Sequence, residues 1–367
     1  MNAMSSNGAE GTVVNSLQRV AAEAMRRQAA SHPPSHRRTL PLRVGTRGSP
    51  LALVQTRAFL TRLTRFCPVL RDMGAFQEHQ ISTTGDQVQS RLLAEIGGKG
   101  LFAKEIHEAL AAGRIDFAVH SLKDLETDLP DGLELACTLK REDARDVLLL
   151  HPRLRAAVRE GADPLDVLPP NALIGCASVR RQAQLLHRRP DLRFCLLRGN
   201  VQTRLDKLSG GACDATMLAL AGLRRLGMED RADVVLDPSE MIPAAGQGIV
   251  GVTARSADVE LLDLLSAIED PEARAVATAE RALLAVLDGS CRTPIGGYAR
   301  LVAKPGGRTG HGALSGYDLV LTGLVAREDG SFFLKRELVG APGDALRLGQ
   351  ELGASLRKDS PADIFED

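Results

Sequence analysis

Short apolar runs alternate with amphipathic helical stretches from Leu42 onward, a pattern typical of βαβ units. In the first part of the chain the pattern predicts strands at Leu42–Val44 and Ile115–His120. It also predicts one helix that starts at Pro50 and a second at Leu101–Ala112, which Gly-rich sequence precedes. These elements predict a first α/β unit.

Polar residues gather where the predicted strand Ile115–His120 ends. Ser121, Lys123 and Asp124 follow that strand in a loop, and α/β folds bind ligands at the carboxyl ends of parallel strands. Ser49 is the predicted N-cap of the first helix, just after the first strand.

The same alternation continues from about Glu142 and predicts a second α/β unit. Its predicted strands and helices are, in chain order, Leu173–Cys176, Ser178–Arg189, Phe194–Leu197, Asn200–Leu208, Ala215–Leu218 and Leu220–Leu226. The segment Met241–Thr253 is predicted to return to the first unit as a strand.

The last hundred residues have a different order. A helix at Pro271–Leu287 leads through a loop to three strands, and a helix at Asp344–Arg357 follows them. The three predicted strands are Tyr298–Ala303, Asp318–Arg327 and Ser331–Val339. This order predicts a small α+β domain with a three-stranded antiparallel sheet.

The predicted fold class is therefore α/β, with two doubly wound domains and a C-terminal α+β domain. The first domain is expected at residues 41–140 together with 243–266, the second at 141–242 and the third at 267–367. Residues 1–40 carry five arginines against two glutamates, a net charge of +3, and lack the apolar run of a secretory signal. They are predicted to be a disordered extension, with an organelle-targeting segment as the alternative.

Composition narrows the class of protein. Lys plus Arg and Asp plus Glu are both 46, so the net charge is zero, which argues against a nucleic-acid binder. The sequence has no apolar run of about eighteen residues, so no membrane span is predicted. The six cysteines show no metal-binding or redox spacing, so we expect no metal site and a cytoplasmic, reducing compartment.

Arginines stand where helix dipoles disfavour them. Between residues 175 and 204 there are seven arginines and one acid, Asp191, although helix N-termini carry partial positive charge. The arginines at or next to predicted helix starts are Arg47, Arg180, Arg181, Arg198 and Arg204. A polyanionic ligand, planar carboxylates above all, would explain them, because guanidinium groups bind carboxylates in a bidentate way. The alternative is a solvated basic face, which Arg188, Arg189 and Arg193 fit well.

Asp124 and Cys291 are the two further candidates for chemistry. A carboxylate among so many cations stays ionised and can stabilise a developing cation or move a proton, although a surface Lys123–Asp124 pair is the alternative. Cys291 lies in a loop beside Arg292, and a neighbouring cation favours the thiolate. An inert surface thiol remains the alternative for Cys291.

Seven motifs in order resemble the porphobilinogen deaminase (hydroxymethylbilane synthase) family, from about Leu42 to the C-terminus. These motifs are Arg47-Gly48-Ser49-Pro50-Leu51-Ala52, Gly97-Gly98-Lys99-Gly100-Leu101-Phe102, Ala118-Val119-His120-Ser121-Leu122-Lys123-Asp124, Arg180-Arg181-Gln182, Leu197-Arg198-Gly199-Asn200-Val201, Pro243-Ala244-Ala245-Gly246-Gln247-Gly248, and Cys291 before Pro294-Ile295-Gly296. The resemblance implies two domains like those of type II periplasmic binding proteins and a third that carries a dipyrromethane cofactor on Cys291. It also implies that four porphobilinogens join this cofactor head to tail, each losing ammonia, before hydrolysis releases hydroxymethylbilane. The enzyme would then be a cytoplasmic monomer, without nucleic-acid or membrane partners.

The resemblance also implies roles for residues of this chain. The expected catalytic residues are Asp124, which stabilises azafulvenium-like cations, Arg47, which assists proton transfer, and Lys123. The residues expected to hold the cofactor are Cys291, Ser121, Lys123, Asp124, Ser178, Arg180, Arg181 and Arg225. The residues expected at the incoming substrate are Arg47, Ser49, Phe102, Arg198 and Arg204. The cations expected in this cleft have few acids beside them, so we expect them to repel one another until carboxylates bind. They are Lys123, Arg180, Arg181, Arg198, Arg204 and Arg225.

Some residues depart from the family pattern. Glu126 stands where many members have proline, Cys176 and Ala177 replace hydroxyl residues, and Glu95 stands where lysine is frequent, within an implied lid at Gln89–Lys99. Two other functions stay open from the residues alone: a carboxylate-binding module without catalysis, and a thiol-dependent hydrolase that uses Cys291.

Overall fold

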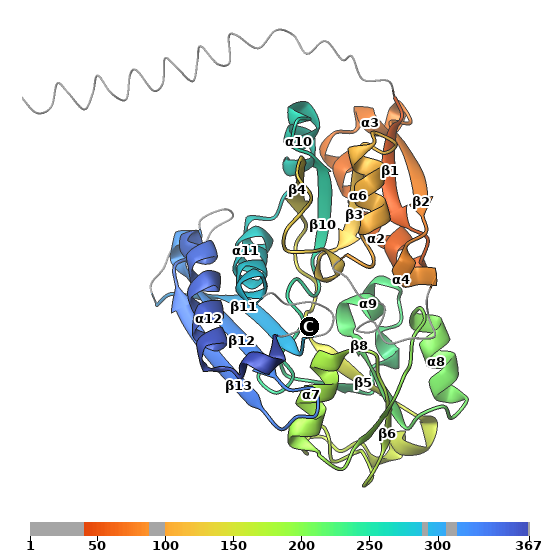
Figure 1. Ribbon diagram of the computed structural model, residues 1–367. Helices are drawn as coiled ribbons and strands as arrows, with labels where there is room; N and C mark the ends of the chain where they lie inside the picture. Colours follow the sequence, from red (N-terminus) through yellow and green to blue (C-terminus); the bar gives the residue numbers. More distant parts are fainter. Residues whose placement is uncertain (1–39, 88–99, 288–292, 306–313, 366–367) are drawn as a thin grey trace, which may run out of the picture. The chain divides into compact units, whose positions relative to one another are not determined.

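The computed structural model describes residues 40–87, 100–287, 293–305 and 314–365 (Figure 1). Three parts named above therefore lie outside the described residues: the extension up to residue 39, the implied lid at Gln89–Lys99, and Cys291. Among the described residues, no helix combines the length and the apolar composition needed to cross a membrane.

The first sheet has five strands in the order β2-β1-β3-β10-β4 (Figure 1). Their bounds are β1 Leu42–Arg47, β2 Phe76–Ile81, β3 Phe117–Ser121, β4 Leu133–Thr138 and β10 Val250–Arg255. Strand β1 runs parallel to β2 and β3, whereas β10 runs antiparallel to both β3 and β4. The predicted return of the chain to the first unit is thus confirmed.

Helices cover both faces of this sheet. On one face, Phe59 and Leu63 of α2 (Pro50–Phe66) and Leu265 of α10 (Val259–Ser266) pack against the apolar side chains of β1, β3 and β10. On the other face, α6 (Lys104–Ala111) inserts Ile106 and Leu110. The inner strands β1, β3 and β10 bury most residues of both faces, whereas the edge strand β2 has no fully buried residue. The helix predicted from Leu101 begins at Lys104, because residues 100–103 form a turn.

The second sheet repeats the arrangement in the order β7-β6-β8-β5-β9. Its strands are β5 Asp146–Leu150, β6 Leu173–Gly175, β7 Arg193–Cys195, β8 Ala215–Ala219 and β9 Val234–Val235. Strand β6 is parallel to β7 and β8, and β5 is antiparallel to β8 and β9. Helices α7 (Val179–Arg188), α8 (Val201–Ser209) and α9 (Leu220–Arg225) follow β6, β7 and β8, as the sequence predicts.

The chain crosses between the two sheets twice, first after β4 and again before β10. Backbone hydrogen bonds join these two crossing segments. The N–H of Leu139 donates to the carbonyl of Val250, and the N–H of Glu142 donates to that of Gly248, at 3.0 and 2.9 Å. Gly248 has a φ of +87°, and a Cβ there would lie 2.3 Å from the Glu142 oxygen. Only glycine therefore allows the crossing segments to approach this closely.

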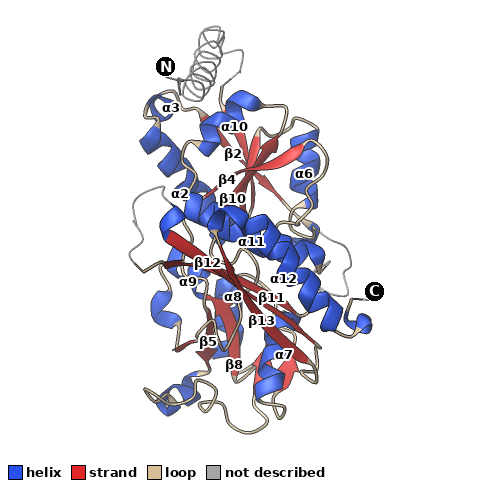
Figure 2. Cartoon of the chain, turned by 90° about the vertical axis from the view of Figure 1, so that its left-hand side faces the viewer, coloured by secondary structure: helices blue, strands red, loops and turns tan. Residues whose placement is uncertain are grey.

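The C-terminal part is an antiparallel sheet of three strands, β11 (Ile295–Ala303), β12 (Tyr317–Ala326) and β13 (Phe333–Gly340). Figure 2 shows α11 (Pro271–Val286) and α12 (Ala345–Asp359) lying side by side across it. A Cβ at Gly349 of α12 would lie 2.4 Å from the Ala279 oxygen of α11, so glycine permits this close packing. The predicted fold class is confirmed: two α/β domains with helices on their sheets, and a C-terminal α+β domain with a three-stranded antiparallel sheet.

Glu280 of α11 ties the C-terminal part to both crossing segments. Its fully buried carboxylate pairs with Arg141 at 2.6 Å and accepts the N–H groups of Gly246 and Ala299 at 2.7 and 2.6 Å. Burial raises the pKa of Glu280, although Arg141 and the two N–H groups oppose that rise. The crossing segments, which carry part of the candidate site, are thus held from the side of α11.

Candidate functional site

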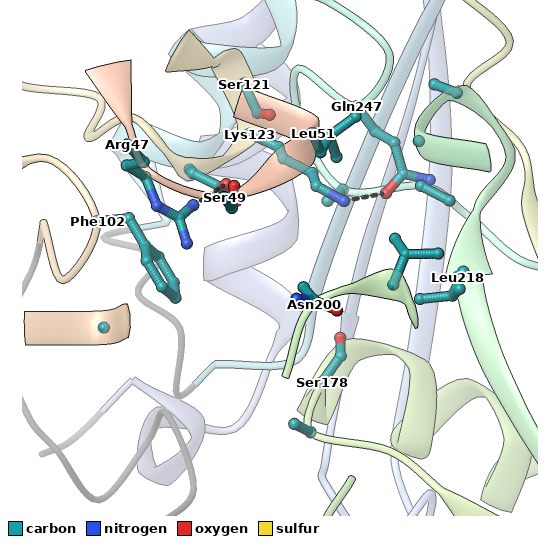
Figure 3. A pocket seen from close by; sticks show the side chains of 18 of the residues that line it. Arg47, Ser49, Leu51, Phe102, Ser121, Lys123, Ser178, Asn200, Leu218 and Gln247 are labelled. Atoms are coloured by element: carbon teal, nitrogen blue, oxygen red, sulfur yellow. Dashed lines mark hydrogen bonds and ion pairs between the residues drawn. The ribbon is translucent and has the colours of Figure 1, made fainter. Parts of the chain in front are cut away.

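A cavity of about 960 Å³ lies where the strand ends and helix starts of both α/β domains meet the second crossing segment (Figure 3). Every predicted site residue in the described ranges lines it. These residues are Arg47, Ser49, Phe102, Ser121, Lys123, Asp124, Ser178, Arg180, Arg181, Arg198, Arg204 and Arg225. The structure therefore brings together residues that lie up to 178 positions apart, from Arg47 to Arg225.

Arg47, at the end of β1, is held by two acids and an aromatic ring. Its Nε and one Nη donate to the two carboxylate oxygens of Asp86, at 3.1 and 2.5 Å, and its other Nη lies 3.4 Å from Asp124. Its guanidinium carbon stands 4.2 Å from the centroid of the Phe102 ring, and Figure 3 shows the two side chains together. Arg47 is therefore oriented before any ligand binds.

Asp86 is a residue of the site that the sequence analysis missed. It lies in the short helix α4 (Thr84–Gln87), and its carboxylate also accepts the Thr83 hydroxyl at 2.7 Å. Burial alone would raise the pKa of Asp86, but the hydrogen bonds and charge of Arg47 outweigh it and hold the pKa below its usual value. Because Asp86 takes the bidentate contact, Asp124 keeps only one long contact to Arg47.

Lys123 lies next to the second crossing segment. Its Nζ donates to Oε1 of Gln247 at 3.3 Å (Figure 3). The amide nitrogen of Gln247 donates to the Ala144 carbonyl and to Asp146. Burial lowers the pKa of Lys123 to about 8, and the charge of Arg181 adds to the effect. A lysine in this environment gains from any anion that binds beside it.

Asp146, at the start of β5, is the second acid of the site that the sequence analysis missed. It is fully buried and accepts one Nη from each of Arg180 and Arg181, at 2.8 and 2.7 Å. Burial would raise its pKa, yet the two arginine charges hold it well below the usual range. The expectation of arginines with few acids beside them is therefore wrong for this pair: Asp146 offsets part of their charge, and Nε of Arg181 is left without a partner among the described residues.

Replacing Asp146 by asparagine is expected to lower the free energy of unfolding by about 3–5 kcal/mol, since the change leaves two buried guanidinium groups without their counter-charge. Chemical denaturation monitored by circular dichroism measures this. Asp344→Asn is the matched control, because Asp344 pairs with Arg347 on an exposed surface, and its loss should cost less than about 1 kcal/mol. Equal effects of the two substitutions would contradict the importance of the buried triad.

Three helix N-termini open toward the cavity, each with a capping side chain and no acid in its first turn. Ser49, Ser178 and Asn200 cap α2, α7 and α8 by accepting backbone N–H groups. The partial positive charge of these helix ends adds to that of the arginines and favours anions. Cys176 departs from the family pattern without disturbing this geometry, since its sulfur accepts the N–H of Ser178 at 3.4 Å.

Three further arginines face the cavity from the second domain. Arg198 donates to the carbonyl of Gly85 at 3.0 Å, Arg204 to that of Gly199 at 2.9 Å, and Arg225 to that of Gly248 at 2.7 Å. Burial lowers the pKa of Arg204 to about 10, helped by the charges of Arg181 and Arg198, and burial also lowers that of Arg225. Such buried positive charge favours carboxylates in the cavity.

Three of the arginines lie outside the lining of the cavity. Arg188, Arg189 and Arg193 bind Asp163, Asp191 and the carbonyl of Asn171, as expected of a solvated face away from the cavity. Within the described ranges, no group of three or more His, Cys, Asp or Glu side chains is placed to hold a metal ion. The site is thus built from cations, helix ends and a few fixed carboxylates.

Sequence comparison matches this chain along almost all of its described length. A family model described as "Porphobilinogen deaminase, dipyromethane cofactor binding domain" matches residues 42–263, and one described as "Porphobilinogen deaminase, C-terminal domain" matches residues 274–358. Porphobilinogen deaminase of Nitrobacter winogradskyi is 45% identical over 322 residues, which cover 88% of this chain and 94% of that protein. The chloroplastic porphobilinogen deaminase of Oryza sativa is 42% identical over 328 residues, 89% of this chain and 86% of that protein.

Solved structures are more distant. The VFT2 domain of BvgS from Bordetella pertussis is 14% identical, with a TM-score of 0.38 over 70% of this chain and 96% of that one. The putative periplasmic sulfonate-binding protein SsuA from Methylobacillus flagellatus is 15% identical, with a TM-score of 0.34 over 67% of each chain. TM-scores this low support no inference about the present site.

The fold and the site define an α/β protein with a cavity lined by cations and helix N-termini, and the sequence matches identify its family. The chain belongs to the porphobilinogen deaminase family, whose members are transferases that act on porphobilinogen and use a dipyrromethane cofactor. This agrees with the polyanionic ligand predicted from the arginines, because each pyrrole of such a chain carries an acetate and a propionate.

The described residues fit a bound dipyrromethane. Two such pyrroles bring four carboxylates, and the cavity offers buried cations whose charge is only partly offset, among them Lys123 and Arg204. Arg181 lines the same cavity, and its buried Nε has no hydrogen-bond partner in the part of the chain that the structure describes. Buried polar groups in folded proteins are nearly always hydrogen-bonded, and a carboxylate of the cofactor would accept a hydrogen bond from this Nε.

The pKa of Lys123 gives this fit a test. In a cofactor-free Cys291→Ser protein, the pKa of Lys123 is about 8 in the folded state and about 10.5 in the unfolded state. Between these two pH values the folded state therefore binds fewer protons than the unfolded state. Stability should therefore rise as pH increases from about 8 to about 10.5, and Lys123→Met should remove that rise. Thermal melts at several pH values measure it. In the loaded protein, carboxylates beside Lys123 should weaken the rise, and identical profiles for loaded and cofactor-free protein would contradict the fit.

Proposed function

We propose that this chain is a hydroxymethylbilane synthase in which Asp124, Arg47 and Lys123 carry the chemistry. The observation that supports the proposal most directly is the placement of Asp124, half-buried beside Arg47 in a cavity otherwise rich in cations. A carboxylate there accepts the N–H of a substrate pyrrole. Its charge stabilises the cation that forms when porphobilinogen loses ammonia.

Arg47 acts as a hydrogen-bond donor in this proposal rather than as an acid that gives up its proton. Burial opposes its charge, but Asp86 and Asp124 raise the pKa of Arg47 above its usual value, so the guanidinium remains protonated. Asp86 and the Phe102 ring fix its orientation. Arg47 therefore positions Asp124 and the reacting aminomethyl group, and it offers no proton of its own for transfer.

The carboxylates of substrate and cofactor are divided between two groups of residues. Ser49, Arg198 and Arg204 face incoming porphobilinogen, and Arg204 keeps guanidinium hydrogens beyond the one it donates to Gly199. The residues that would hold the cofactor are Ser121, Lys123, Asp124, Ser178, Arg180, Arg181 and Arg225, with its thioether on Cys291. When bound, the dipyrromethane supplies the pyrrole carbon to which each porphobilinogen is joined.

We further propose three domains, at residues 41–140 with 243–266, at 141–242 and at 267–367, and the strands that make up each of the three sheets support this division. The enzyme is proposed to be a cytoplasmic monomer without nucleic-acid or membrane partners, and residues 1–40 to be an extension or a targeting segment. Gel filtration with light scattering tests the monomer.

Incubation with porphobilinogen tests the proposal. Release of hydroxymethylbilane, followed by its cyclisation to a porphyrin, is expected from the purified protein. Arg204→Gln should raise KM by about 10- to 100-fold, the cost of losing a charged hydrogen bond worth about 1.5–3 kcal/mol. Arg188→Gln, on the solvated face, is the control and should leave KM unchanged. Porphobilinogen bound but never consumed would instead favour the carboxylate-binding module that the sequence leaves open.

A further inference from the structure

Gly85 is a buried residue of α4, and the ring of Phe102 lies directly against it. A Cβ at position 85 would lie 2.3, 2.5 and 2.8 Å from three carbon atoms of that ring. Non-bonded carbon atoms pack about 3.5–4.0 Å apart, so an alanine at this position would force either the ring or the helix to move. Gly85 does not have a positive φ, which means that the lack of space, and not the backbone conformation, excludes a side chain.

The backbone of Gly85 is fixed on both sides, so the helix is not the part that would move. Its N–H donates to the carbonyl of Leu101 at 2.9 Å, and its own carbonyl accepts Arg198 at 3.0 Å. Both bonds use backbone atoms of Gly85, so an alanine can also make them. The Phe102 side chain is only half-buried and lines the cavity, and its ring is therefore the group that would be displaced.

The ring that lies against Gly85 also contacts Arg47. The guanidinium carbon of Arg47 stands 4.2 Å from the centroid of the Phe102 ring, and Figure 3 shows the two side chains together. An aromatic face attracts a cation at this distance. Asp86 binds the same guanidinium through Nε and one Nη, and the other Nη is directed to Asp124. Displacing the ring would thus remove the contact on the face of the guanidinium and leave its contact with Asp86 in place.

We propose that Gly85 is a positioning residue for the reaction. Its missing side chain lets the Phe102 ring lie against α4, and from there the ring supports the guanidinium of Arg47 beside Asp124. The inference rests on the roles proposed above for Arg47 and Asp124. Because the ring supports Arg47 and not the groups that hold carboxylates, a side chain at position 85 should slow the chemical step more than it weakens substrate binding.

The kinetics of Gly85→Ala in the cofactor-loaded enzyme test this role. We expect kcat to fall by about tenfold and KM for porphobilinogen to change by less than about threefold, since one cation–π contact with a positioning residue is lost. Gly343→Ala is the matched control, because a Cβ there meets no atom within 4 Å, and both constants should match those of the wild type. A Gly85→Ala enzyme with the kcat of the wild type would overturn the proposal.

A second background separates the displacement of the ring from other effects of an alanine. Phe102→Ala removes the ring and should itself lower kcat by about tenfold, because Arg47 loses the same contact. Adding Gly85→Ala to Phe102→Ala should cost nothing further, since the new Cβ no longer meets a ring. An equal loss in both backgrounds would show that the alanine acts through the backbone, which would overturn the proposal. If Gly85→Ala alone fails to fold, the double variant should fold, and its failure to do so would have the same consequence.

The position of the ring can also be followed without substrate. With fluorophenylalanine in place of the nine phenylalanines, the fluorine resonance of Phe102 is assigned by its absence in Phe102→Ala. That resonance should shift in Gly85→Ala and stay in place in Gly343→Ala. An unshifted resonance in Gly85→Ala would overturn the proposal even in an active enzyme. A wild type that releases no hydroxymethylbilane would contradict the proposed function, while the fluorine spectrum would still decide whether Gly85 sets the position of the ring.

Discussion

Asp124→Asn is expected to slow hydroxymethylbilane formation by at least roughly a hundredfold, an increase of about 2.7 kcal/mol in the activation barrier. The substitution keeps the size of the side chain and its ability to accept a hydrogen bond, but it removes the charge that faces the developing cation. Asp86 continues to hold Arg47, so the loss should appear in the chemical step rather than in the geometry of the site. Single-turnover measurements with saturating porphobilinogen isolate that step.

Two controls make this prediction specific. The melting temperature of Asp124→Asn should match the wild type, because Asp124 is only half-buried and makes one long contact to Arg47. Asp163→Asn, which removes an exposed partner of Arg188, should leave the rate unchanged. A rate within about threefold of the wild type would show that the charge at position 124 is not used in the chemistry.

The pattern of apolar residues predicts most of the longer helices and the inner parallel strands, and the elements that it misses include helix α10 and strands β2, β4, β5 and β9. Strand β2 is an edge strand whose residues Phe76–Ile81 are mostly polar, so its alternation is weak. Strand β5 is the opposite case, a fully buried run of five residues without alternation. Strand β4 follows a loop with no α-helix between β3 and β4, so the alternation of strands and helices that predicts the other strands does not predict this one.

The candidate site is predictable as far as its chemistry lies in local motifs. Arginines next to helix caps are visible in the sequence, and every one expected to bind carboxylates lines the cavity. Asp86 and Asp146 could not be found in this way, because their roles come from pairs with residues 39, 34 and 35 positions distant. Both acids lie beside arginines in space and not in sequence, which is why the sequence overstated the repulsion among the cations.

Buried acids change the expected energetics of the cofactor-free protein. Asp146 already balances part of the charge of Arg180 and Arg181, and Gln247 accepts a hydrogen bond from Lys123, so the cofactor-free cavity should hold less repulsion than the sequence implies. The carboxylates of the cofactor would offset the positive charges of Lys123 and Arg204, whose pKa values burial lowers. A ligand attached to the folded state alone still stabilises it by linkage, and salt should still reduce the difference by screening.

Cys291 is the residue on which the cofactor assignment depends, and its loss should have an absolute effect. The resemblance to the family implies a thioether on Cys291, which lies outside the described part of the chain. Cys67 is only half-buried and Cys213 is buried, and neither lines the cavity. Burial raises the pKa of the Cys213 thiol to about 11, which makes that residue a poor nucleophile and a suitable control.

The intact mass of the purified protein, read together with its colour in Ehrlich's reagent, tests the central claim most directly. The wild type and the Cys213→Ala variant should each carry an added mass of two pyrrole units and give the pyrrole colour. The Cys291→Ala variant should show the bare mass of the chain, no colour and no hydroxymethylbilane formation. An adduct that persists in Cys291→Ala, or a wild type that carries none, would contradict the assignment of this chain as a cofactor-bearing deaminase.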